Sequence, residues 1–223
     1  MATTRETNGD ETEDDVTVLP SLAHPHDGLF RYAFGRPEHA EGELAHVLGA
    51  ELASRIDWRT LELAPGTYID EALRPSASDL LYTARLIEDG TRIYVLFEHQ
   101  SSNDPWMLLR LLGYTHALWA RGLREGAARD GGLPPIVPVV LHHGPGGWSS
   151  ARRFSELFLL ADDARAALSP HLVDFGLALD DLTRLGPDEL KARRSLTDFA
   201  RLVLMLLQRA RSSPDLIQDL EAF

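Results

Sequence analysis

The chain has 223 residues, of which 44% are hydrophobic and 25% are charged, and it contains no cysteine. These values are ordinary for a globular protein and exclude collagen-like, coiled-coil and wholly disordered chains. The lack of cysteine excludes disulfide frameworks, thiolate zinc sites and cysteine nucleophiles.

The net charge of −12 is unevenly distributed. Residues 1–15 contain six acidic residues and one arginine, a net charge of −5, which leaves −7 for the remainder. The acidic total argues against a nucleic-acid partner, since phosphate binding usually requires a basic surface, but the uneven distribution weakens that argument. Of the 22 basic residues only Lys191 is a lysine, and the other 21 are arginines. We interpret this preference for arginine as an effect of genomic base composition, and the alternative is that arginines are used for phosphate contacts.

The N-terminal residues have neither a basic start nor an apolar segment, so we expect no signal peptide. The longest apolar runs are too short to span a bilayer. Together with the lack of cysteine, these features lead us to expect a cytoplasmic protein without a membrane partner.

Residues 1–20 are polar, acidic and without periodicity, which predicts a disordered tail. The spacing of apolar residues between Leu29 and Leu52 then predicts two short amphipathic helices, separated near Gly35 and Pro37. Residues 57–70, DWRTLELAPGTYID, predict a strand with a Pro-Gly turn.

A β-hairpin follows, with strands at residues 78–87 and 91–100 and Asp89-Gly90 as a two-residue type I′ turn. Asp104 and Pro105 predict the start of a helix that extends to about residue 123. The apolar residues 136–144 predict a buried strand, and the chain after about residue 150 is predicted to be helical.

This order of elements predicts an α/β fold, in which helices pack on a small mixed sheet. We expect one main domain at residues 21–150, with a helical C-terminal part at residues 151–223 packed on it.

The predicted hairpin brings polar side chains together. With a two-residue turn, Asp79 lies opposite Gln100 and Leu81 opposite Glu98. Side chains alternate along a strand, so Asp79, Glu98 and Gln100 project from one face of the sheet. The two carboxylates are then diagonal neighbours, roughly 7 Å apart at the backbone, and can share one cation.

Two carboxylates and a nearby backbone carbonyl are typical ligands of Mg²⁺ or Mn²⁺. Such an ion assists phosphodiester hydrolysis, and Gln100 could orient the attacking water. The simpler interpretation is that Asp79 only begins a strand, while Glu98 and Gln100 form the solvated end of another. Without further context, a short pattern favours the simpler interpretation.

The flanking motifs supply that context. Residues 77–86, ASDLLYTARL, and 94–119, YVLFEHQSSNDPWMLLRLLGYTHALW, resemble the Rpn family of recombination-promoting nucleases, also called YhgA-like proteins. This family belongs to the PD-(D/E)XK nuclease superfamily. Further matching motifs are HDGLFRYAFG at 26–35, IDWRTLELAPGTYIDEALR at 56–74 and LPPIVPVVLHHG at 133–144.

The resemblance implies a restriction-endonuclease-like core, a divalent metal ion and DNA cleavage, linked to recombination or mobile elements. Carried over by position, Asp79 matches the central aspartate of the superfamily and Glu98 its second acid. Gln100 matches the position that is often lysine in the superfamily and commonly glutamine in this family.

Arg110 and Tyr114 lie four residues apart on the helix after Gln100, so we expect them to share a face and to bind a phosphate. Packing of Tyr114 against the sheet is an equal alternative for that residue.

Other polar residues have mainly structural interpretations. We interpret Glu41 and Glu43 as surface residues and Asp27 as a helix cap. His142 and His143 are adjacent on a strand and point to opposite faces, which prevents them from sharing a metal ion.

Two functions remain. The first is a metal-dependent DNA endonuclease, in which Asp79 and Glu98 hold Mg²⁺ or Mn²⁺, Gln100 orients water and Arg110 assists phosphate binding. The second is a catalytically inactive protein of the same fold that acts as an interaction or regulatory module. A homodimer suits the first function, because two sites cut two strands more easily than one.

Overall fold

The structure is a computed structural model and describes residues 25–65, 80–126 and 132–209. Five strands form one sheet in the order β1-β2-β3-β4-β5. They are β1 (Ile56–Leu63), β2 (Leu80–Leu86), β3 (Arg92–Gln100), β4 (Ile136–His142) and β5 (Ala178–Asp181). β2 runs antiparallel to both β1 and β3, whereas β3, β4 and β5 run parallel to one another.

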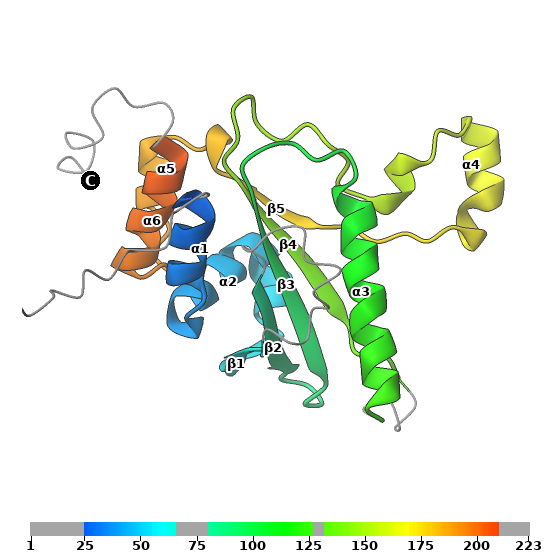
Figure 1. The fold of residues 1–223 in the computed structure, drawn as a ribbon, viewed down its shortest axis with the longest axis horizontal. Coiled ribbons are helices and arrows are strands. Elements are labelled where there is room, and N and C mark those ends of the chain that lie inside the picture. Colours follow the sequence, from blue (N-terminus) through cyan, green and yellow to red (C-terminus); the bar gives the residue numbers. More distant parts are fainter. Residues whose placement is uncertain (1–24, 66–79, 127–131, 210–223) are drawn as a thin grey trace, which may run out of the picture.

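Helices cover both faces of the sheet. α1 (Pro25–Phe34), α2 (Pro37–Ala53) and α6 (Asp198–Arg209) lie on one face, and α3 (Met107–Arg124) lies on the other (Figure 1). α3 also joins β3 to β4, as a parallel pair of strands requires a crossover connection. The short helices α4 (Asp162–Leu168) and α5 (Pro187–Lys191) follow β4.

This architecture confirms the predicted α/β fold and is consistent with a restriction-endonuclease-like core. The two N-terminal helices, the hairpin, α3 and β4 all lie close to their predicted positions. None of the helices described by the structure is long and apolar enough to cross a membrane.

β3 is the centre of the molecule, because it has a strand on each side and a layer of helices on each face. Its residues from Val95 to Gln100 are all buried. Val95 and Phe97 belong to the apolar core on the α1, α2 and α6 face, and Leu96 belongs to the core under α3. A polar residue at the end of β3 is therefore placed inside the protein.

The hairpin forms as predicted, but its turn differs. Leu81 pairs with Leu96, so the register is displaced by two residues from the predicted pairing of Leu81 with Glu98. The connection between the strands has four residues, 87–90. A type I′ turn needs a positive φ at two residues, but within this connection only Gly90 has one, at 71°. The Gly90 N–H donates to the Leu86 carbonyl. Four-residue loops of this kind are a common alternative to the type I′ turn.

A displacement of two residues leaves every side chain on its predicted face, because the strand repeat is also two. The predicted pairing of Asp79 with Gln100 lies outside the described residues.

The prediction of helices after residue 150 is incomplete, because β5 lies in this region and extends the sheet beside β4. β5 has only four residues, ALDD, and two of them are charged. Its own sequence does not favour a strand, and pairing with β4 decides its conformation.

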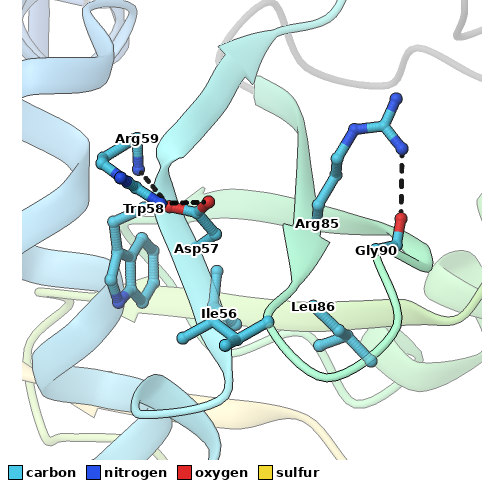
Figure 2. A pocket seen from close by; sticks show the side chains of 8 residues that line it. Ile56, Asp57, Trp58, Arg59, Arg85, Leu86 and Gly90 are labelled. Carbon is cyan, nitrogen blue, oxygen red and sulfur yellow. Dashed lines mark hydrogen bonds and ion pairs between the residues drawn. The ribbon is translucent and has the colours of Figure 1, made fainter.

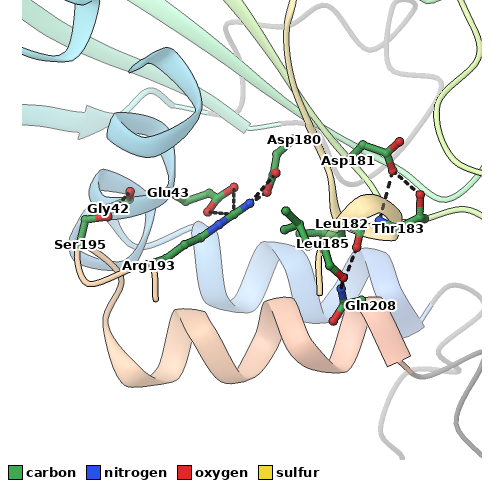
Figure 3. Close-up of polar contacts among 10 residues, drawn as sticks. All are labelled: Gly42, Glu43, Asp180, Asp181, Leu182, Thr183, Leu185, Arg193, Ser195 and Gln208. Carbon is green, nitrogen blue, oxygen red and sulfur yellow. Dashed lines mark hydrogen bonds and ion pairs between the residues drawn. The ribbon is translucent and has the colours of Figure 1, made fainter. Parts of the chain in front are cut away.

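A buried ion cluster joins the C-terminal helices to α2 and β5 (Figure 3). The Arg193 guanidinium is 3.1 Å from Glu43 Oε2 and 2.7 Å from each Asp180 carboxylate oxygen. Gly42 permits this approach, since a Cβ at that position would lie 2.1 Å from the Ser195 carbonyl oxygen.

The prediction of a surface position is thus wrong for Glu43, which is fully buried. It is confirmed for Glu41, which is exposed. Glu41 and Glu43 are two positions apart on α2 and therefore face different directions. Both are glutamates, so their charge does not tell which of them is buried.

Burial raises the pKa of Glu43 well above its ordinary value of 4.5, and the neighbouring Asp180 carboxylate adds to the rise, although Arg193 opposes it. A raised folded-state pKa means that the folded protein binds a proton more tightly than the unfolded chain. The stability that this proton supplies is complete below pH 4.5 and is lost as the pH rises through the folded-state pKa.

We predict that Glu43→Gln removes this pH dependence. The free energy of unfolding of the wild type should fall relative to the variant as the pH rises above 4.5, by up to about 1.4 kcal/mol per pH unit. Urea unfolding across this pH range measures the difference. Glu41→Gln is the matched control and should follow the wild-type curve, whereas parallel curves for Glu43→Gln and wild type would refute the prediction.

Candidate active site

Glu98 and Gln100 lie at the carboxyl end of β3, on the face covered by α3. Glu98 is 0% exposed and Gln100 is 9% exposed. The Gln100 side-chain amide donates a hydrogen bond of 3.2 Å to Glu98 Oε2. The prediction that these two side chains share a face is confirmed, whereas the alternative of a solvated strand end is wrong.

Arg110 reaches this pair from the first turns of α3. One guanidinium nitrogen is 3.0 Å from Glu98 Oε2, and the other is 2.7 Å from Asp104 Oδ2. Burial acts to lower the pKa of Arg110, but Glu98 and Asp104 outweigh it and raise this pKa above its ordinary value. The guanidinium therefore remains charged between two carboxylates.

α3 begins at Met107, two residues after the predicted start at Pro105, and no side chain caps it. Asp104 lies just before the helix, where its Oδ1 accepts a hydrogen bond of 2.8 Å from the Trp106 backbone N–H. Tyr114 is 1% exposed and packs in the core under α3. Its ring thus follows the predicted alternative of packing, and its contribution to phosphate binding stays a prediction.

Asp79 immediately precedes β2 and lies outside the residues described. Within residues 25–65, 80–126 and 132–209, no three or more His, Asp and Glu side chains are grouped to hold a metal ion. Glu98 nevertheless has the right chemistry for one ligand, because carboxylate oxygens are preferred by Mg²⁺ and Mn²⁺. A buried carboxylate also requires a cation or hydrogen-bond donors beside it.

Polar residues also lie beside Gln100 on the two neighbouring parallel strands. Gln100 pairs with His142 on β4, and His142 pairs with Asp181 on β5. Burial lowers the pKa of His142, so its imidazole is neutral near pH 7. Burial acts to raise the pKa of Asp181, but hydrogen bonds from Thr183 and the Trp148 backbone N–H outweigh it and lower this pKa.

His143 points to the opposite face, as predicted, and stacks on His99 with 4.8 Å between ring centroids. His99 in turn stacks on Phe30 of α1 and lies 2.9 Å from Asp27 Oδ1. The prediction that Asp27 caps a helix is incorrect, because Asp27 lies inside the first turn of α1 and contacts the sheet.

Asn103 ties together the loops that follow β3 and β4. Its side-chain amide donates to the Gly147 carbonyl at 2.6 Å, and its oxygen accepts from the Ser149 N–H at 2.7 Å. The carboxyl ends of parallel strands are the usual ligand sites of α/β sheets, so this bridge stabilises the rim of the candidate site. Sequence reasoning does not identify Asn103, because its partners are more than 40 residues away.

A surface pocket of about 540 Å³ lies at the other end of the hairpin, between β1 and β2 (Figure 2). Its polar lining includes Asp57, Arg59 and Arg85. Arg59 binds both oxygens of Asp57, and Arg85 donates to the Gly90 carbonyl. Asp57 is the single carboxylate in the described lining of this pocket, and it is paired with Arg59.

Comparison with known proteins identifies the family. Residues 24–223 match the family described as "Putative transposase, YhgA-like". The chain belongs to this YhgA-like family. This confirms the resemblance inferred from the motifs.

Three relatives of the YhgA-like chain are recombination-promoting nuclease RpnD of Escherichia coli O157:H7, recombination-promoting nuclease RpnA of Escherichia coli K12, and inactive recombination-promoting nuclease-like protein RpnE of the same strain. Their identities with it are 30% over 196 residues, 31% over 193 and 30% over 197. The alignments cover 86%, 86% and 88% of the chain, and 70%, 62% and 62% of the respective relatives.

The chain therefore spans roughly two thirds of the length of these relatives. Two of the three names denote nucleases and the third denotes an inactive relative, so membership supports a nuclease family without establishing activity. No solved structure matches the chain significantly.

We predict that Arg110→Met destabilises the protein by about 3–5 kcal/mol, because it leaves the buried Glu98 carboxylate without its cation. Adding Glu98→Gln to this variant should restore part of the loss, since the neutral amide needs no cation. Urea unfolding at pH 7.5 measures all three proteins.

The control is Arg92→Met, an exposed arginine on the same sheet, which should change the free energy of unfolding by less than about 0.5 kcal/mol. If Arg110→Met is as stable as this control, the pair of Arg110 and Glu98 contributes no net stabilisation.

Proposed function

We propose that the chain is a metal-dependent DNA endonuclease whose active site is centred on Glu98. The observation that carries this proposal is a fully buried carboxylate at the carboxyl end of β3, in contact with an amide and a guanidinium. Membership of a family with relatives named as nucleases gives this arrangement a chemical interpretation.

Asp79 and Glu98 are the proposed ligands of Mg²⁺ or Mn²⁺. Both supply hard oxygen donors, and a site built from one or two carboxylates leaves room for water and a substrate phosphate. When bound, the ion lowers the pKa of water and stabilises negative charge on the reacting phosphate.

Gln100 and Arg110 complete the proposed site. The Gln100 amide can donate and accept, which suits it to orient the attacking water, but it has no positive charge. Arg110 approaches the same Glu98 oxygen from α3 and places a permanent cation beside it. We infer that Arg110 supplies the positive charge that a lysine at position 100 would otherwise provide, and that it binds the scissile phosphate.

The proposed substrate is DNA, and cleavage is expected to serve recombination or mobile elements. The net charge of −12 predicts weak and strongly salt-sensitive binding. Cleavage of both strands would be aided by a homodimer. The lack of cysteine suits action in the cytoplasm.

A second candidate is a catalytically inactive protein of the same fold. The specific reason to retain it is the similarity to RpnE, whose name denotes an inactive relative, at 30% identity. The contacts of Glu98, Gln100 and Arg110 do not favour this candidate over the first.

Cleavage of supercoiled plasmid at low salt tests the proposal, with Mg²⁺, Mn²⁺ or EDTA in the reaction. We predict metal-dependent nicking by the wild type. Asp79→Ala and Glu98→Gln should each lose about 100-fold or more, because each removes a ligand of the ion and the loss of even an outer-shell partner costs about 10- to 100-fold. Glu62→Ala, which removes an exposed carboxylate of β1, is the control and should retain full activity.

Equal traces of nicking in all four proteins would mean contamination, and the inactive interaction module would then be the better account. Activity that persists in Glu98→Gln but is lost in EDTA would place the metal site elsewhere.

A further inference from the structure

Trp106 is the most exposed of the four tryptophans in the chain. The residue is 62% exposed, although it lies immediately before α3. The other three are held within the structure: Trp58 and Trp119 donate to backbone carbonyls, and Trp148 is 4% exposed. An indole of a residue exposed to this extent has area available for a ligand.

The backbone of Trp106 is linked to the candidate active site by consecutive contacts. The Asp104 carboxylate accepts from the Trp106 N–H at 2.8 Å and from Arg110 at 2.7 Å, and Arg110 is 3.0 Å from Glu98 Oε2. The Arg110 N–H also donates to the Trp106 carbonyl at 3.0 Å. Trp106 is thus held at the rim of the site by a fixed backbone, not by a loose loop.

The residues next to it favour a nucleic acid as the ligand. Leu109, which follows Trp106 by about one turn, is 51% exposed and extends the apolar surface. Arg110 adds a guanidinium that is 22% exposed and is paired with Glu98 and Asp104. An aromatic platform beside a cation is the combination that binds unpaired bases and their phosphates.

We propose that Trp106 is a stacking platform for an unpaired base next to the scissile phosphate. This inference rests on the proposed nuclease function and narrows its substrate class to single-stranded or locally unpaired DNA. A base inside a duplex has no free face, so the platform gains contact only where the strand is unstacked. Trp106 binds substrate in this proposal and takes no part in proton transfer.

Binding of a fluorescein-labelled 20-nucleotide oligo(dT) strand tests the proposal, with fluorescence anisotropy in low salt and EDTA as the readout. We expect Trp106→Ala to weaken binding by about 5- to 150-fold, the range of one lost base stack. Trp106→Phe should restore most of it, because phenylalanine retains an aromatic face. The affinity for a 20-base-pair duplex should differ much less between the wild type and the variants.

Leu123→Ala is the matched control, since Leu123 is 61% exposed near the other end of α3. It should bind oligo(dT) like the wild type. Quenching of intrinsic tryptophan fluorescence by unlabelled oligo(dT) gives a second readout, which should be largely lost in Trp106→Phe and retained in Leu123→Ala.

Plasmid nicking by the same variants separates this inference from the nuclease proposal. If nicking persists but Trp106→Ala binds oligo(dT) like the wild type, the platform is refuted and the nuclease stands. If the wild type neither binds nor nicks, both proposals fail. If Trp106→Ala changes only the sedimentation coefficient, the exposed indole belongs to a protein interface and the platform is again refuted.

Discussion

The Glu98 carboxylate lies in the centre of the sheet without exposure to solvent, and the surrounding structure compensates for its charge. Removing such a group from water costs several kcal/mol unless a cation and hydrogen-bond donors replace the solvent. Arg110 and Gln100 do so at one oxygen, and Asp104 in turn holds Arg110. The same contacts fix the start of α3 against β3, so the helix that covers this face is positioned by the charge beneath it.

The alternation of side chains separates this site from a second group of charges. Asp181 shares the face of Gln100 and His142, whereas the adjacent Asp180 binds Arg193 and Glu43 on the other face. The second cluster anchors the C-terminal helices to α2 and the sheet. We interpret it as structural, because its three side chains join α2, β5 and the segment between α5 and α6. The face of Glu98 ends instead in the loops joined by Asn103, at the carboxyl ends of the parallel strands, where α/β sheets usually bind their ligands.

Much of this arrangement could be predicted from local sequence. The alternation in β3 predicts that Glu98 and Gln100 share one face, and this does not depend on the turn, because both residues belong to the same strand. The error of two residues in the hairpin register also leaves the β2 side chains on their predicted faces. Other features depend on contacts between distant segments. Local sequence predicts a surface position for Glu43, because its partner Arg193 lies 150 residues away along the chain. β5 is a strand only because β4 lies beside it, and Asp27 contacts His99 across 72 residues. Patterns of a few residues contain no signal for such pairs.

The central claim is that Glu98 is a ligand of a divalent metal ion. Crystals of the full chain soaked in Mn²⁺ test it most directly, through anomalous difference density collected near the manganese absorption edge. The account predicts a peak within about 2.3 Å of a Glu98 carboxylate oxygen, with Asp79 as a second ligand. It also predicts that the peak is lost in Glu98→Gln crystals. Manganese bound only at other sites, with Arg110 still occupying the Glu98 carboxylate, would contradict the account.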